Sequence, residues 1–210
     1  MQAFAPGKLV VLGEYAVLDG APCLALAVRN GVVCNVSHAA TRTIRTPDGD
    51  DRFVRAALDA LPAPAATYAF RDAMPLDLPD KPGLGGSAAA VVAALVAGGC
   101  PPDRLLPLAL EVHRAVQGSG SGIDVATSAT GGAIRFEEGR VTPSSIPAPV
   151  VVYSGSSART GPRVQAYRAW AARQPFVDAS AALVDRFPSE PIATVREAWR
   201  LLCGMAEAAG

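Results

Sequence analysis

Residues 82–90 read Pro82-Gly83-Leu84-Gly85-Gly86-Ser87-Ala88-Ala89-Ala90, a glycine-rich loop followed by small apolar residues. Closely spaced glycines lack Cβ atoms, so several backbone N–H groups can converge on one anion. The Ala/Val run that follows predicts a buried helix over Ser87–Ala97, whose N-terminal partial charge adds to such a site. The candidate phosphate-binding residues are Gly83, Leu84, Gly85, Gly86, Ser87, Ala88 and Ala89.

The glycine loop alone leaves two interpretations open. Glycine clusters before helices also serve only to turn the chain. The loop is not the G-x-x-x-x-G-K-[ST] pattern of an ordinary phosphate loop. Ser87 nevertheless supplies a hydroxyl in the first turn of the expected helix, where it could face a phosphate oxygen or a Mg²⁺ ion.

Lysine usage points to a second candidate residue. The sequence contains two lysines, Lys8 and Lys81, and all its other strongly basic side chains are arginines. A compact ammonium on a flexible stem suits contact with a phosphate or a reacting hydroxyl. Lys8 opens a strand-like segment between glycines, which makes it the stronger candidate, whereas Lys81 could be there by chance.

A carboxylate follows the second glycine-rich loop. Asp124 comes directly after Gly118-Ser119-Gly120-Ser121-Gly122-Ile123. It could accept a proton from a substrate hydroxyl, or it could simply cap the next helix.

Composition limits the class of protein. Hydrophobic residues make up 50% of the 210 residues and charged residues 18%, as in a globular chain with a substantial core. Acidic and basic residues balance at 19 each, so we expect no nucleic-acid partner. The most apolar stretch, Ala88–Gly98, is too short to span a bilayer. We expect no signal peptide, because the first residues lack a charged segment and a long apolar one, and the four scattered cysteines predict reduced thiols in a cytoplasmic protein.

The order of expected elements predicts an α+β fold, because strands and helices are mixed without regular alternation. A further strand is expected over Val150–Tyr153. Trp170 and Trp199 are expected to anchor the core or an interface between domains, and His38 to lie on the surface. The remaining strands are expected at 8–12, 23–36, 41–45, 67–70 and 133–136, and the helices at 53–61, 87–97, 103–116, 124–130, 160–173, 176–187 and 194–209.

Three motifs in this order resemble the GHMP kinases. Residues 5–18, Ala-Pro-Gly-Lys-Leu-Val-Val-Leu-Gly-Glu-Tyr-Ala-Val-Leu, resemble the first motif of that superfamily. Residues 83–89 resemble its second motif, usually written G-L-G-S-S-A-A. Residues 120–124 with Gly131-Gly132 resemble the segment that bears its catalytic aspartate.

The resemblance implies a fold and a reaction. It implies an N-terminal ATP-binding domain over 1–148, with a fold like that of ribosomal S5 domain 2. Residues 149–210 would be the start of a ferredoxin-like C-terminal domain. That domain is expected to be truncated, because the third glycine-rich motif of the superfamily is missing. The resemblance implies ATP and Mg²⁺ as cofactors, with Lys8 and Asp124 catalytic and Ser87 near the metal. The residues on the side of a small-molecule substrate would be Glu14, Tyr15, Ser121, Gly122 and Thr160.

The sequence also resembles one branch of the superfamily, and it departs from the family motifs at two positions. Gly13-Glu14-Tyr15-Ala16 and residues 153–160 resemble bacterial phosphomevalonate kinases, with mevalonate kinases next, in a monomer or homodimer. Gly86 replaces a serine of the second motif, and His113 stands where mevalonate kinases often carry a Mg²⁺-binding glutamate. These departures keep open a non-catalytic ligand-binding or sensor protein.

Overall fold

The computed structural model describes residues 1–74, 82–155 and 160–209, with only the backbone at Thr160. Lys81 and residues 156–159 of the substrate-side stretch lie outside the described residues. The contacts divide the chain into two compact units: the first holds residues 1–9, 27–74 and 83–132, and the second holds 10–26 and 133–209. Strands β1 (Gln2–Leu12) and β2 (Cys23–His38) are long enough to contribute to both units.

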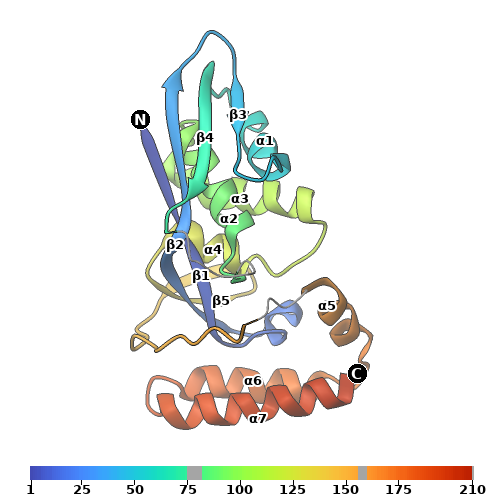
Figure 1. Ribbon diagram of the computed structural model, residues 1–210. Helices are drawn as coiled ribbons and strands as arrows, with labels where there is room; N and C mark the ends of the chain where they lie inside the picture. The colour runs from blue at the N-terminus through green and yellow to red at the C-terminus, as the bar shows by residue number, and fades with distance from the viewer. Residues whose placement is uncertain (75–81, 156–159, 210) are drawn as a thin grey trace. The chain divides into compact units, whose positions relative to one another are not determined.

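The first unit is a sheet with helices on one face (Figure 1). In it, β2 pairs antiparallel with β4 (Ala66–Asp72), from Val32 opposite Asp72 to His38 opposite Ala66. Strand β3 (Thr43–Arg45) pairs parallel with β4, and β1 pairs with β2. The helices are α1 (Arg52–Asp59), α2 (Gly86–Ala97), α3 (Pro102–Gln117) and α4 (Ile123–Thr130).

Helix α2 lies at the centre of the first unit's core. Its residues are almost all alanine, valine or leucine, so no polar face competes for solvent and the helix is buried nearly all round. Tyr68 of β4 packs in the same core, fully buried, and its hydroxyl donates to the Pro64 carbonyl at 3.1 Å. The small side chains of α2 let it approach the sheet closely.

Two glycines make β1 and β2 approach each other closely. A Cβ atom at Gly31 would lie 2.1 Å from the Ala5 carbonyl oxygen, and one at Gly7 would lie 2.1 Å from the Asn30 carbonyl oxygen. No side chain fits either position without moving backbone. This crossing fixes the place at which Lys8, the next residue, leaves the strand.

The second unit combines a hairpin with three helices. Strand β5 (Ala133–Glu137) pairs antiparallel with β2, from Cys23 opposite Phe136 to Leu26 opposite Ala133, and with β6 (Arg140–Pro143). Helices α6 and α7 lie side by side (Figure 1). The helical segments are a short 3-10 helix (Ala16–Asp19), α5 (Thr160–Ala169), α6 (Gln174–Arg186) and α7 (Pro191–Ala209).

Two apolar clusters hold the second unit together. In one, Tyr167 of α5 and Phe176 of α6 pack around Ala16 and Ala21. In the other, Leu12 and Leu24 pack against Val184 of α6 and Phe187, which directly follows that helix. The first cluster therefore joins the 3-10 helix to α5 and α6.

The α+β class is confirmed, and so is each predicted helix, with ends shifted by a few residues. His38 is exposed, as expected. The strand predicted over Val150–Tyr153 is wrong: this segment pairs with no described strand, and Val150 and Val152 are 93% and 85% exposed. A valine run has strand propensity, but a strand forms only where a neighbour supplies hydrogen bonds.

The two tryptophans differ. Trp170 is half-buried and packs against the first apolar cluster of the second unit, with its ring centroid 6.1 Å from that of Phe176. Trp199 is 69% exposed, so the expectation that it anchors a core is wrong. Within the described ranges, no helix combines the length and apolar character that crossing a bilayer requires.

Candidate functional site

The glycine loop of the first unit forms a tight turn at the start of α2. Gly83 and Gly85 have φ angles of 71° and 76°, the left-handed region that glycine tolerates best. Gly85 is the N-cap residue, and no side chain caps the helix there. The Lys8 N–H donates to the Leu84 carbonyl at 2.8 Å and fastens the loop to β1. The N-terminus of α2 is thus left without a protein cap, which suits an anion.

Lys8 and Asp124 lie beside the same glycine. A Cβ atom at Gly85 would be 2.8 Å from Lys8 Cγ, 3.4 Å from Lys8 Cε and 3.7 Å from Asp124 Cβ. Residues 8, 85 and 124 are far apart in sequence, so the fold itself brings these side chains together. An ammonium and a carboxylate therefore flank the turn that begins α2.

Asp124 stands in the first turn of α4 and not at its cap. The N-cap is Gly122, with a φ of 87° and no side-chain cap. Asp124 Oδ1 accepts a hydrogen bond from the Val125 N–H at 3.0 Å, and Ser121 Oγ accepts one from the Ile123 N–H at 3.3 Å. Asp124 is therefore not the N-cap residue, although one of its oxygens bonds a first-turn N–H of α4.

Ser87 pairs with a buried histidine. Its Oγ lies 3.2 Å from Nε2 of His113, which comes from α3. The His113 ring also stacks on Phe53 of α1, with centroids 5.2 Å apart, and is 4% exposed. Three helices of the first unit therefore fix the orientation of the Ser87 hydroxyl.

The charge state of His113 follows from its surroundings. Burial lowers the pKa of its imidazole below the ordinary value, and the negative charge of Asp124 opposes that shift in part. His113 is neutral near pH 7, so one of its ring nitrogens can accept a hydrogen bond from the Ser87 hydroxyl.

The residues around Ser87 could supply only a small part of the ligands of a Mg²⁺ ion. Across the residues that the structure describes, no three His, Cys, Asp or Glu side chains gather into a metal-binding cluster. Mg²⁺ in nucleotide sites is held chiefly by phosphate oxygens and water, with one or two protein oxygens. The Ser87 hydroxyl meets that need, whereas the imidazole of His113 is a poor ligand for a hard cation.

Glu14 and Tyr15 belong to the second unit, in the turn that follows β1. Tyr15 has a φ of 64°, a strained value for a residue with a side chain, and directly precedes the 3-10 helix. Its ring lies 5.6 Å from that of Tyr167, centroid to centroid. Strain of this kind persists only where the surroundings hold the residue, and such positions cluster at functional sites.

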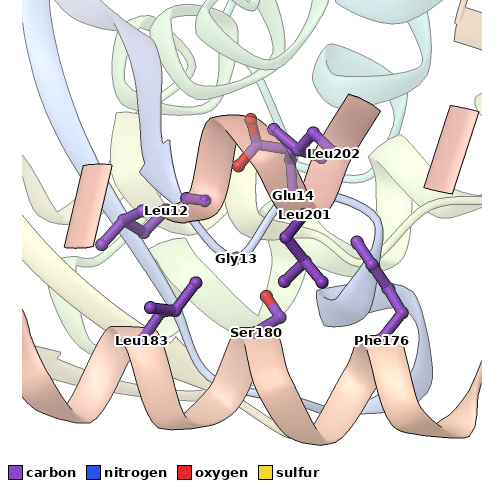
Figure 2. A pocket seen from close by; sticks show the side chains of 9 residues that line it. Leu12, Gly13, Glu14, Phe176, Ser180, Leu183, Leu201 and Leu202 are labelled. Atoms are coloured by element: carbon purple, nitrogen blue, oxygen red, sulfur yellow. The ribbon is translucent and has the colours of Figure 1, made fainter. Parts of the chain in front are cut away.

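A recess in the second unit includes Glu14 in its lining. It is a shallow recess of about 220 Å³ that is partly open to solvent. Figure 2 shows Phe176, Ser180 and Leu183 of α6 directed toward Leu12 and Leu201. The lining is Leu12, Gly13, Glu14, Phe176, Ser180, Leu183, Ala198, Leu201 and Leu202. No lysine or arginine belongs to it, so the recess does not have the character of a phosphate site.

Comparison with known proteins decides the family. Residues 53–132, which contain all four helices of the first unit, match the family described as GHMP kinases N terminal domain. Mevalonate kinase of Thermococcus gammatolerans is 30% identical over 199 residues. The chain belongs to the GHMP kinase superfamily. That match covers 75% of this GHMP chain and 58% of the archaeal enzyme, so the chain spans well under two thirds of its relative's length.

Solved structures share the fold of this GHMP chain at low identity. A Lin0012 protein from Listeria innocua has a TM-score of 0.86 at 20% identity, covering 100% of this chain and 79% of that one. Streptococcus pneumoniae phosphomevalonate kinase, in complex with phosphomevalonate and AMPPNP, has a TM-score of 0.78 at 17% identity, covering 98% of this chain and 80% of that one. The expected GHMP kinase fold is thereby confirmed.

The predicted site residues of this GHMP chain fall into two groups. The first unit brings together Lys8, the Gly83-to-Ala89 loop and Asp124, with Ser121 and Gly122 just before α4. Glu14, Tyr15 and the backbone of Thr160 lie in the second unit. Sequence reasoning missed that His113 is the partner of Ser87, although the resemblance had put both residues near the same expected metal.

Proposed function

We propose that this GHMP chain carries the phosphoryl-transfer site of an ATP-dependent kinase of the mevalonate pathway, with phosphomevalonate as the acceptor. The observation that carries the proposal is that the side chains of Lys8 and Asp124 both lie beside Gly85. Phosphoryl transfer needs an anion site, a cation and a proton acceptor around one point, because catalysis is mainly positioning and charge neutralisation.

The α2 N-terminus would hold the phosphates of ATP. Its backbone N–H groups and its partial positive charge favour an anion, and the glycines allow close approach. Ser87, oriented by His113, would face a phosphate oxygen or Mg²⁺. Bound Mg²⁺ would neutralise charge on the transferred phosphoryl group.

Asp124 and Lys8 would act on the acceptor. In phosphomevalonate the attacking atom is a phosphate oxygen, and Asp124 would take the proton from that oxygen or orient it; in mevalonate it would act on the hydroxyl in the same way. The acceptor oxygen then bonds to the γ-phosphorus while the bond from that phosphorus to the β–γ bridging oxygen breaks, releasing ADP. Lys8 would stabilise the negative charge that develops on the acceptor oxygen.

The acceptor is proposed from the residues around Tyr15. The Gly-Glu-Tyr-Ala sequence resembles phosphomevalonate kinases, and on this proposal Glu14, Tyr15, Ser121, Gly122 and Thr160 face the acceptor. Mevalonate is the second candidate, supported by the archaeal relatives named mevalonate kinase. The proposal includes an ATP-binding domain over 1–148, a second domain from 149, a cytoplasmic location and a monomeric or homodimeric state.

The test is ATP consumption by the full chain with phosphomevalonate, mevalonate and a panel of sugars. Turnover with phosphomevalonate at the highest kcat/KM is the expected result. Asp124→Asn and Lys8→Met should each lower kcat by about 10²-fold or more, while nucleotide affinity stays within about threefold.

Asp103→Asn is the matched control, because Asp103 also stands in the first turn of a helix but is exposed. It should leave kcat unchanged. Wild-type turnover in the Asp124 and Lys8 variants would refute their roles. Nucleotide binding by calorimetry without any product would favour the non-catalytic binding protein instead, which the replacement of an oxygen ligand by His113 also supports.

A further inference from the structure

Asp19 forms a dense polar cluster at the end of the 3-10 helix. The Tyr167 hydroxyl donates to Asp19 Oδ2 at 2.6 Å. The Arg173 guanidinium donates to both Asp19 oxygens, with Nε 3.2 Å from Oδ1 and 3.1 Å from Oδ2, and Nη2 3.1 Å from Oδ1. One carboxylate therefore accepts from two side chains that are about 150 residues away in sequence.

Arg173 makes two further contacts in this cluster, with Trp170 and with the ring of Tyr167. Arg173 Nη1 donates to the Trp170 carbonyl at 3.2 Å, and its guanidinium carbon lies 5.9 Å from the centre of the Tyr167 ring. The hydrogen bond from Arg173 lowers the pKa of Asp19, against the effect of burial, so the carboxylate is charged at neutral pH. Charge-assisted, forked hydrogen bonds are the stronger kind and fix orientation as well as distance.

Tyr167 connects this cluster to Tyr15. The Tyr167 ring is 1% exposed, and it contacts Tyr15 on one side and Phe176 on the other, at centroid distances of 5.6 and 5.9 Å. Tyr15 is one of two described residues other than glycine with a positive φ. The ring that Asp19 and Arg173 hold in place is thus the ring on which the strained residue rests.

We propose that Asp19, Tyr167 and Arg173 form a clasp that positions Tyr15 and its turn for the acceptor substrate. The inference rests on the proposed function in so far as Tyr15 faces the acceptor. The three clasp residues are positioning residues, since they act through Tyr15. The clasp joins the 3-10 helix, α5 and the start of α6, so it also sets where α5 and its first residue, Thr160, stand relative to Tyr15 within the second unit.

The test compares Asp19→Asn with a variant that loses a similar ion pair elsewhere. Glu197→Gln removes one of the two carboxylate partners of Arg186, a 2.8 Å ion pair between α6 and α7. In Asp19→Asn, KM for the acceptor should rise about tenfold, with KM for ATP within about twofold and kcat within about threefold. Glu197→Gln should change none of them.

Two further variants separate a folding defect from a positioning defect. Tyr167→Phe keeps the ring and loses the hydroxyl, and Arg173→Lys keeps the charge and loses the fork. Both variants should raise the acceptor KM less than Asp19→Asn does. The melting temperature of Tyr167→Phe should stay unchanged. A fall in kcat alone, or an equal rise in both KM values, would overturn the positioning role.

Hydrogen exchange gives a readout that needs no acceptor. The N–H groups of Val17, Leu18 and Ala21 donate to carbonyls within residues 13–16. Their exchange should be about tenfold faster in Asp19→Asn and unchanged in Glu197→Gln. Unchanged exchange in Asp19→Asn overturns the clasp even if the chain is an active kinase. Faster exchange without turnover on any acceptor supports the clasp and counts against the proposed function alone.

Discussion

Ser87 Oγ and His113 Nε2 lie 3.2 Å apart, so the hydroxyl at the first turn of α2 is held by a neutral, buried ring. The ring stacks on Phe53, which prevents it from turning away. A serine whose hydroxyl donates to this ring keeps its oxygen lone pairs free to face whatever the N-terminus of the helix binds.

Replacing His113 with alanine should impair both stability and nucleotide binding. The variant loses the stacked ring and leaves a cavity, which costs about 2–4 kcal/mol in the free energy of unfolding. The freed Ser87 hydroxyl should weaken ATP binding by about tenfold. Urea unfolding and nucleotide titration measure the two effects. His38→Ala changes the chain's other histidine, which is exposed, and should alter neither the stability nor the nucleotide affinity.

Replacing Gly85 with alanine should reduce turnover beyond its effect on stability. A non-glycine residue at a φ of 76° costs about 1–2 kcal/mol, and the new methyl group would also push against Lys8 Cγ. Gly99→Ala is the control: its φ is 87°, but a Cβ there meets nothing within 4 Å. Both variants should lose similar stability, and only Gly85→Ala should lose kcat, by about tenfold. Equal kcat in the two would contradict the contact with Lys8.

Asp19 should make the stability of the protein fall at acid pH. Its pKa is lowered in the folded state, first by the hydrogen bond from Arg173, relative to about 3.9 in the unfolded chain. Its contribution is therefore complete above the unfolded pKa and is lost as pH falls through the lower folded pKa. Urea unfolding of wild type and Asp19→Asn should differ near neutral pH and converge toward pH of about 2. A constant difference across that range would exclude a charged Asp19 from the clasp.

The four cysteines should react at very different rates. Burial raises the pKa of the Cys34 thiol to about 12, so it has almost no thiolate at neutral pH, whereas Cys203 is exposed. A thiol reagent should label Cys203 first in the native protein and Cys34 only on unfolding. Cys203→Ser should remove the fast phase. Rapid labelling of Cys34 in the native state would show that the first unit's core opens readily.

Elements with clear boundaries and unusual composition could be predicted from the sequence. Helix α2 was recognisable because its apolar run is bounded by glycines, and Lys8 because lysine is rare in this chain. Val150–Tyr153 failed because propensity does not reveal whether a strand has a neighbour. The clasp could not be foreseen, since Asp19, Tyr167 and Arg173 have no pattern in sequence and meet only through the packing of α5 and α6.

The exposed valines at 150–152 have a practical consequence for handling the protein. A short, uncharged, β-prone segment that offers its backbone to solvent is a template on which other copies can add strands. Concentrated samples would then form sheet-rich aggregates before the folded units themselves melt. A lysine in place of Val151, which touches neither the glycine loop nor the clasp, is the first change to make when preparing crystals.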